Sequence, residues 1–216
     1  MSFLRVAIGT FCNLLVTIPL AYALSKKFLG RTFITFAIFF TMLFSGGLIP
    51  SYILVQKLGL LNSFWSMIIP GLVNAWWMLI MRNFFGEIPD SYEEAAIIDG
   101  ANFLTILLRV IIPLSLASIA VIGLFYAVWH WNDWFTSFIY LTDNKLWPLQ
   151  NRLKSILDRT LTETVDVPKH VNIVVMPPTQ SLRSAMIVIT TIPILFAYPF
   201  IQKYFVKGVK IGGIKG

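Results

Sequence analysis

The sequence predicts an all-α fold, a polytopic bundle of transmembrane helices. Hydrophobic residues make up 57% of the 216 residues and charged residues only 12%, whereas soluble domains carry about 25% charged residues. Several apolar runs approach the roughly 20 residues that a helix needs to cross a bilayer. Helices satisfy their own backbone in lipid, and the strict apolar–polar alternation typical of half-buried strands is absent.

Five segments have the length and composition of spans: 4–24, 33–54, 64–85, 106–129 and 184–205. The first is expected to be a true span and not a cleaved signal, because its apolar run is long and lacks a cleavage site of small residues. Prolines lie within or near the ends of spans, where they are tolerated and often bend helices. Simple kinks and functional flexing are both open for Pro19, Pro70, Pro113, Pro193 and Pro199.

Basic residues predict the orientation, because short cytoplasmic loops are enriched in Lys and Arg. If the spans alternate, most basic residues fall on one side, whereas the short loop at 45–63 carries only Lys57. The sequence therefore predicts a plasma-membrane protein with the polar loop at 87–105 and the C-terminus in the cytoplasm, the long loop at 141–182 outside, and residue 1 outside. The basic residues on the cytoplasmic side are Lys26, Lys27, Arg31, Arg82, Arg109, Lys203, Lys207, Lys210 and Lys215.

The net charge of +7 is explained by these flanking residues, so nucleic-acid binding is not indicated. Cys12 is the one cysteine, cannot form an intrachain disulfide, and is expected to be a small packing residue.

The polar loop at 87–105 is the most informative part of the chain. Asp90 or Ser91 is expected to cap a helix, since each has a glutamate three residues later. Glu93 and Glu94 would then occupy the first turn, where the helix dipole favours negative charge. Gly100 is expected to end this helix, and a second helix is expected to start near Asn102 and run into the fourth span. These features alone describe an ordinary capped helix between two spans.

The spacing through residue 113 resembles the "EAA loop" of ABC importer permeases. Three residues separate Glu94-Ala95-Ala96 from Gly100, and nine residues separate Gly100 from Val110-Ile111-Ile112-Pro113. The resemblance covers nearly the whole chain, including Asn13 with Ala21 to Ser25, Trp131 to Trp134, and a glycine-rich tail similar to that of sugar permeases. The most similar subgroup pairs with a second, different permease and imports oligosaccharides or polysaccharide fragments.

This resemblance implies one type I transmembrane domain over 1–216, usually with one more span upstream, and a coupling helix that sits in a groove of a cytoplasmic ATPase. The glutamate at position 94 would pair with a basic residue there, and the tail at 206–216 would reach the ATPase dimer. The implied coupling residues are Glu93, Glu94, Ala95, Ala96, Asp99, Gly100 and Pro113, and the implied tail contacts are Lys215 and Gly216.

The chain has no phosphate-binding loop, so no cofactor is expected on it, and ATP and Mg²⁺ are expected on the partner subunit. The resemblance implies four partners: an ATPase dimer, a second permease, an extracellular solute-binding protein and membrane lipid.

Polar and aromatic residues at membrane depth suggest a solute pathway, because intramembrane polar groups usually face the bundle interior. The candidates are Asn13, Asn74, Trp76, Trp77, Trp129 and Asn132. The tryptophans could instead form an interfacial aromatic belt, the role favoured for Trp129 to Trp134, and Asn13 could bridge helices. Asp133 is expected at the outer boundary in contact with solvent. The outer loop could contact the binding protein or be a solvated connector, with a short amphipathic helix at 149–157.

Two other classes of protein fit less well. A membrane-embedded enzyme would need clustered acid–base or metal-binding residues, but His130 and His170 have no suitably spaced partners and no nucleophile–base pair stands out. A structural or receptor protein would not explain the polar loop. Within transport, a permease for peptides or another polar solute remains the alternative to a carbohydrate permease.

Overall fold

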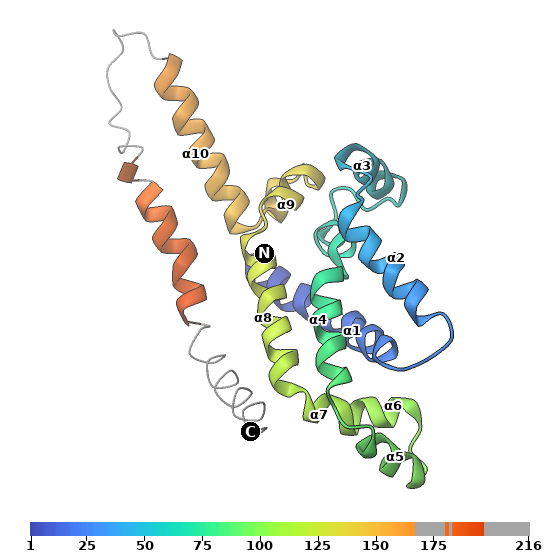
Figure 1. Cartoon of the computed structure of the whole chain (residues 1–216). Coiled ribbons are helices and arrows are strands. Elements are labelled where there is room, and N and C mark those ends of the chain that lie inside the picture. Colours follow the sequence, from blue (N-terminus) through green and yellow to red (C-terminus); the bar gives the residue numbers. More distant parts are fainter. Residues whose placement is uncertain (167–179, 182, 197–216) are drawn as a thin grey trace.

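The computed structural model describes residues 1–166, 180, 181 and 183–196. Within them the chain forms helices and no strand, which confirms the predicted all-α class (Figure 1). Helix α1 (Ser2–Ser25) contacts both α4 (Ala75–Gly86) and α8 (Leu116–Asn132), and these three helices form the centre of the molecule. The predicted contact tail, Lys215 and Gly216, lies outside the described residues.

Helix α1 is the one predicted span that is a single continuous helix in the described part of the chain. Its 24 residues extend about 36 Å at 1.5 Å per residue, enough to cross a hydrocarbon layer of roughly 30 Å. Pro19 lies inside it without ending it.

The second predicted span, 33–54, is wrong as a single helix. It consists of α2 (Arg31–Leu43) and α3 (Leu48–Lys57), which meet at 113°. The break falls at Ser45-Gly46-Gly47, and Gly47 has a φ of +89°, a left-handed conformation that glycine adopts without steric cost. Apolar residues stand on both sides of this short turn and resume at Leu48, so a hydrophobicity average over the segment gave no sign of it.

The third predicted span, 64–85, is also bent, by 54°. It begins with two short 3₁₀ turns, η1 (Phe64–Met67) and η2 (Ile69–Gly71), and continues as α4. Pro70 lies in η2, and the Asn74 side chain accepts from the Trp77 N–H to start α4. A proline followed by a capping asparagine therefore divides this segment into two helical pieces.

The fourth predicted span, 106–129, is wrong at its first third. The chain passes from α6 (Phe103–Ile106) through a π-helical turn, η3 (Leu107–Ile111), and α7 (Ile112–Leu114), then bends by 85° at Ser115 into α8. Pro113 has no N–H to donate to the carbonyl of Arg109, and a π turn is one way to accommodate that loss. The later part of this segment is therefore α8, whereas 106–114 lie before the bend and continue the helical stretch that begins with α6.

The segment that follows α8 contains α9 (Phe135–Tyr140), the short turn η4 (Asn144–Leu146) and α10 (Leu149–Asp166). Helix α10 confirms the predicted amphipathic helix and extends beyond 157. The fifth predicted span is described only as the helix Arg183–Phe196, and residues 197–205 lie outside the described part. By length and composition, the described residues contain one spanning helix, or up to four spans if each bent pair counts as one.

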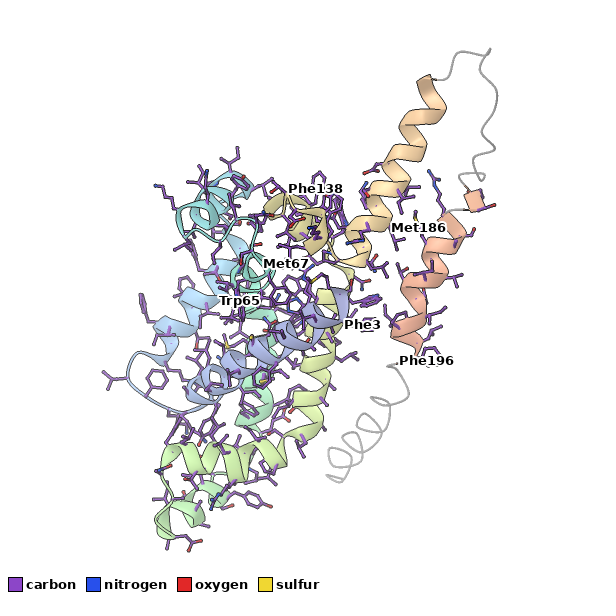
Figure 2. The ribbon with its side chains drawn as sticks, turned by 180° about the vertical axis from the view of Figure 1, so that it is seen from behind. Phe3, Trp65, Met67, Phe138, Met186 and Phe196 are labelled. Atoms are coloured by element: carbon purple, nitrogen blue, oxygen red, sulfur yellow. The ribbon has the colours of Figure 1, made fainter. Side chains whose placement is uncertain are left out.

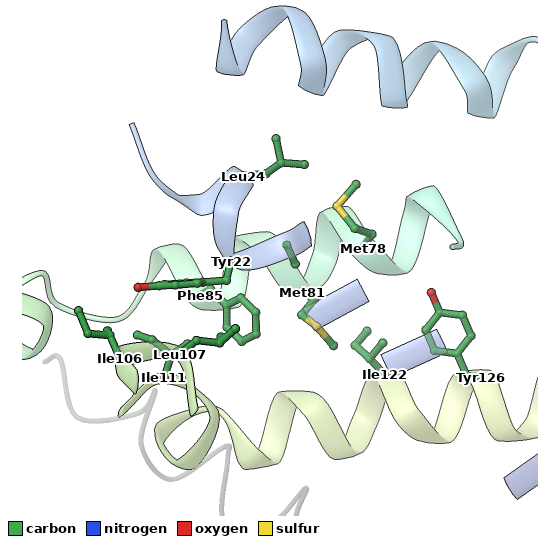
Figure 3. Close-up of a cluster of buried hydrophobic side chains, with 11 residues drawn as sticks. Tyr22, Leu24, Met78, Met81, Phe85, Ile106, Leu107, Ile111, Ile122 and Tyr126 are labelled. Carbon is green, nitrogen blue, oxygen red and sulfur yellow. The ribbon is translucent and has the colours of Figure 1, made fainter. Parts of the chain in front are cut away.

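Buried apolar side chains from α1, α4, α6, η3 and α8 form one core (Figure 3). It contains Ala21, Tyr22, Leu24, Met78, Met81, Phe85, Ile106, Leu107, Ile111, Ile122 and Tyr126. Outside this core, apolar side chains cover the molecule (Figure 2): Phe3 and Phe196 are each 73% exposed, whereas Met67 is fully buried. A surface of this kind matches a lipid or protein environment and not water.

Candidate functional site

The polar loop forms an elbow of two short helices, α5 (Ser91–Ile98) and α6, at one end of the molecule (Figure 1). The expected side-chain cap at its start is wrong: Asp90 is the N-cap, but its side chain makes no capping hydrogen bond. Its backbone carbonyl instead accepts from the N–H groups of Glu93 and Glu94, each at 3.0 Å. Because Asp90 itself has a helical conformation, its side chain does not reach the free N–H groups.

The end of α5 confirms the predicted role of Gly100, which has a φ of +79°. The Gly100 N–H donates to Ile97 O and the Ala101 N–H to Ala96 O, both at 2.9 Å. This pair of bonds is a Schellman motif, which needs a left-handed residue after the last helical turn. The next helix begins as predicted at Asn102, whose side chain accepts from the Thr105 N–H. A defined turn therefore joins α5 to α6.

The elbow is attached to the core through small and apolar side chains. Ala96 and Ala101 are half-buried and pack against the core cluster that includes Ile106, Leu107 and Ile111. The α6–η3–α7 segment continues from there directly into α8 through the bend at Ser115. A displacement of α5 would therefore act on the base of α8.

The two adjacent glutamates of α5 have different surroundings. Glu93 forms an ion pair with Lys26, just after α1, and the Lys26 ammonium lies 5.1 Å from the centroid of the Tyr22 ring. Glu94 is exposed, and no other described residue pairs or bonds with its carboxylate. Glu93 thus fastens the elbow to its own bundle, whereas Glu94 is open to another molecule.

The rest of the α5 tip is also uncovered. Ala95, Asp99 and Gly100 are exposed, and the apolar side chains of Ile97 and Ile98 are 60% and 85% exposed. Exposed isoleucines beside carboxylates on a short helix form a small mixed surface suited to a protein partner. Pro113, by contrast, lies on α7, away from this tip and next to the bend.

The proposed pathway residues fall into two environments, one packed and one exposed, and Asn13 and Asn74 belong to the packed one. Asn13 is fully buried, donates to Gly71 O and Leu72 O at 2.8 and 2.7 Å, and lies 2.7 Å from His130 Nε2. It therefore bridges α1, η2 and α8, the second of the two roles considered for it. Asn74 caps α4 and donates its N–H to the Tyr126 hydroxyl at 3.1 Å.

The tryptophans also divide into packed and exposed side chains. Trp77 packs its ring against Tyr126 and Trp129, with centroids 4.6 and 6.5 Å apart. Trp76 is 58% exposed and Asn132 is also exposed. The structure therefore brings Asn13, Asn74, Trp77 and Trp129 into one packed region, and leaves Trp76 and Asn132 outside it.

A buried ion pair, missed from the sequence, closes the opposite end of α1. Arg5 is fully buried and pairs with Asp133, whose side chain is 11% exposed. The same guanidinium donates to the backbone carbonyl of Asp133. The expectation that Asp133 is solvated is therefore wrong, because the guanidinium at the start of α1 covers it.

Together with Asn13, this ion pair belongs to a line of polar contacts between α1 and α8 that we call the polar seam. Thr17 Oγ1 lies 2.9 Å from Tyr126 Oη, at the other end of the line from the ion pair. The seam consists of Arg5, Asn13, Thr17, Tyr126, His130 and Asp133. Gly9 belongs to the same face, and a Cβ there would overlap the His130 imidazole.

The sequence held a signal for the seam that hydropathy did not use. Residues 5, 9, 13, 17 and 21 of α1 are all buried and are spaced by four, so they share one helix face. Four of them are polar or glycine, in a helix that is otherwise apolar. Small and polar residues on one face are typical of helix contacts within membranes.

Residues 1–211 match the family described as "Binding-protein-dependent transport system inner membrane component". The chain belongs to this family. It is a membrane-embedded permease subunit of an ABC transporter and not an enzyme, and ATP hydrolysis is carried out by a separate subunit.

Individual relatives of this permease are similar along nearly its whole length. The "Polygalacturonan/rhamnogalacturonan transport system permease protein YtcP" of Bacillus subtilis (strain 168) is 43% identical over 210 residues, covering 97% of this chain and 73% of the relative. "Protein LplC" of the same organism is 41% identical over 219 residues, covering 100% and 72%.

A solved structure agrees with the fold of this permease. It is described as the "Crystal structure of a bacterial ABC transporter involved in the import of the acidic polysaccharide alginate". Its similarity to this permease has a TM-score of 0.81 at 34% identity, covering 94% of this chain and 72% of the solved chain.

Proposed function

We propose that this permease imports oligosaccharides or polysaccharide fragments, driven by a cytoplasmic ATPase that binds the α5–α6 elbow. The relatives support the solute class: one is named for polygalacturonan and rhamnogalacturonan transport, and another belongs to an importer of alginate. The exposed Glu94 carboxylate at the tip of α5 is the observation that carries the coupling part of the proposal.

In this mechanism the ATPase groove holds α5 through Glu94, Ala95 and the neighbouring isoleucines. Closure of the ATPase dimer moves α5, and the Schellman turn at Gly100 transmits the motion to α6 and η3. The bend at Ser115, next to Pro113, then tilts α8 relative to α1. Glu93 and Asp99 complete the coupling set, Glu93 by holding α5 to the end of α1 and Asp99 by forming the C-cap of α5.

The partners follow from the same proposal. A second homologous permease would complete the pathway, an extracellular binding protein would deliver the solute to the outer end near α9 and α10, and the tail with Lys215 and Gly216 would contact the ATPase. Trp76 and Asn132 are the proposed pathway residues that remain accessible for contact with a solute.

Co-purification of the ATPase subunit tests the coupling step. Glu94→Lys should abolish it, because a like charge would face the basic residue of the groove. Glu87→Lys is the matched control, since Glu87 is an exposed carboxylate just after α4 and outside α5. Full ATPase retention by the Glu94→Lys variant would exclude docking through Glu94.

Two further measurements test the orientation and the solute. With Cys12 replaced by alanine, a cysteine at Lys215 should react with a membrane-impermeant maleimide only after the cells are opened; labelling of intact cells would contradict a cytoplasmic C-terminus.

Deletion of the gene should abolish uptake of tritiated galacturonic-acid oligosaccharides. Normal uptake of these and of neutral oligosaccharides would favour a non-carbohydrate solute.

A further inference from the structure

A groove between α2 and α4 has no role in coupling or in the polar seam. It encloses about 390 Å³ and is lined by Arg31, Thr32, Thr35, Phe36, Phe39 and Arg82. All but Arg82 come from one face of α2, where the spacing of three and four residues brings side chains together. It lies toward the elbow end, because Arg31 follows the last residues of α1 and Lys26 is paired with α5.

Two guanidinium groups line this groove without an acidic partner. The ion pairs among the described residues involve Arg5, Lys26 and Lys154, and neither groove arginine takes part in one. Arg31 Nε donates to Leu24 O at 3.0 Å. Arg82 bonds to its neighbour Asn83 Oδ1 at 3.0 and 3.3 Å, and at 3.4 Å to Thr35 Oγ1. Two like charges beside one groove favour an anionic occupant.

The groove offers further hydrogen-bond donors at the same place. Helix α2 begins at Arg31 with Gly30 as a cap that supplies no side chain, so the N-terminal end of this 13-residue helix lies at the groove end that holds Arg31. The positive end of the helix dipole adds to the attraction of an anion. Thr32 and Thr35 supply hydroxyls along the same face. Arginine forks with such donors match the geometry of a phosphate group.

The other end of the groove is apolar. Phe36 and Phe39 lie about one and two turns farther along α2 and are 63% and 44% exposed. No residue of α2 is buried. An occupant with an anionic head and an apolar tail would satisfy both ends. A free phosphate would use only the arginine end and leave the phenylalanines uncovered.

We propose that this groove binds an anionic phospholipid, with its phosphate between Arg31 and Arg82 and an acyl chain along Phe36 and Phe39. Basic grooves between membrane helices at the cytoplasmic face are suited to such headgroups. The assignment to the cytoplasmic leaflet rests on the orientation given under the proposed function, whereas the site itself does not.

Native mass spectrometry of the purified full chain tests this site. The chain is incubated in neutral detergent with phosphatidylglycerol or with phosphatidylcholine, and the retained lipids are counted. The wild type should retain phosphatidylglycerol preferentially, and Arg31→Gln/Arg82→Gln should lower its retention about tenfold or more through loss of two charge-assisted contacts. Thr35→Trp should lower it as well by filling the groove while keeping both charges. Arg109→Gln is the control, because Arg109 is an exposed arginine near the elbow that does not line the groove.

Several outcomes would overturn the proposal. One is equal retention by the wild type, the double variant and the Thr35→Trp variant, each checked for intact folding by thermal unfolding. Displacement of phosphatidylglycerol by millimolar inorganic phosphate would assign the groove to a soluble anion instead. Loss of the lipid when a second permease subunit is co-purified would assign it to a protein partner. The assay contains no ATPase, so its result is independent of the coupling experiment.

Discussion

The polar seam and the α5–α6 elbow place similar side chains in opposite environments. In the seam, Arg5, Asn13 and Asp133 are covered by α1 and α8 and bond to partners within the chain. In the elbow, Glu94 and Asp99 face outward, and Ile97 and Ile98 beside them are uncovered. The seam joins α1 to α8 at one end of the bundle, and the elbow projects from the other.

This difference separates residues that build the bundle from residues that are available to a partner. A buried polar group needs an internal partner, since burying it alone is costly. An exposed one needs none, so it can be left for another molecule. Substitutions in the seam should therefore change stability, and substitutions in the elbow should change assembly.

The largest loss of stability is expected for Arg5→Met. It removes one partner of a buried ion pair and leaves the Asp133 carboxylate buried and unpaired, which costs about 3–5 kcal/mol in comparable cases. The thermal unfolding of the purified protein in detergent, followed by tryptophan fluorescence, measures the effect.

A control variant and a double variant sharpen this test. Lys154→Met removes a partner of the exposed Lys154–Asp158 pair and should cost no more than about 1 kcal/mol. Arg5→Met combined with Asp133→Leu should recover much of the stability, because no unpaired charge remains. An Arg5→Met protein as stable as the Lys154→Met protein would show that the seam is not a structural element.

A smaller loss is expected for Gly9→Ala. The new methyl group would overlap the His130 imidazole, which is held between Gly9 and Asn13. Overpacking of this kind costs about 1–3 kcal/mol. Gly86→Ala is the control, because nothing lies within 4 Å of a Cβ there. The same unfolding measurement compares them, and an unchanged midpoint for Gly9→Ala would mean that α1 and α8 separate easily.

The sequence predicted the elbow better than the bundle. Residue 100 was assigned correctly as the end of α5 and Asn102 as the next start, because both are local signals read within one turn of helix. The predicted side-chain cap at Asp90 was wrong. The spacing to Glu93 fits a capping box, but the backbone of Asp90 is itself helical, which a spacing pattern does not reveal.

The bends could not be predicted from hydropathy. An apolar run reports what surrounds a segment and not whether the segment is straight, so hydropathy predicts 33–54 and 106–129 as continuous spans, with a kink left open at Pro113. Gly46-Gly47 and Pro113 marked the breaks, yet glycine and proline are also common inside straight membrane helices, as Pro19 is here. The Arg5–Asp133 pair joins residues 128 apart in sequence, which no local pattern reveals.

A local effect is expected in the elbow for Gly100→Ala. Alanine at a φ of +79° costs about 1–2 kcal/mol, which should loosen the last turn of α5 without affecting the seam. Hydrogen exchange should be faster at the α5 amides and unchanged in α8. Gly46→Ala is the control, because Gly46 has no positive φ and its Cβ would meet only Pro50, at 3.8 Å. Equal exchange in the two variants would mean that the turn is not held by the left-handed conformation.

The smallest effects on stability are expected for Glu93→Gln and Glu94→Gln. The two variants should differ in which property changes most, stability or ATPase binding. Glu93→Gln removes the partly exposed pair with Lys26 and should cost about 0.5–1 kcal/mol, while ATPase binding weakens only as far as α5 shifts. Glu94 has no partner among the described residues, so the unfolding midpoint of Glu94→Gln should match that of the wild type, while ATPase binding falls more than in Glu93→Gln. Unfolding midpoints and ATPase co-purification of the two variants measure both quantities on adjacent positions. If Glu94→Gln destabilised the chain more than Glu93→Gln, the exposed carboxylate would belong to the bundle after all, and the separation between seam and elbow would not hold.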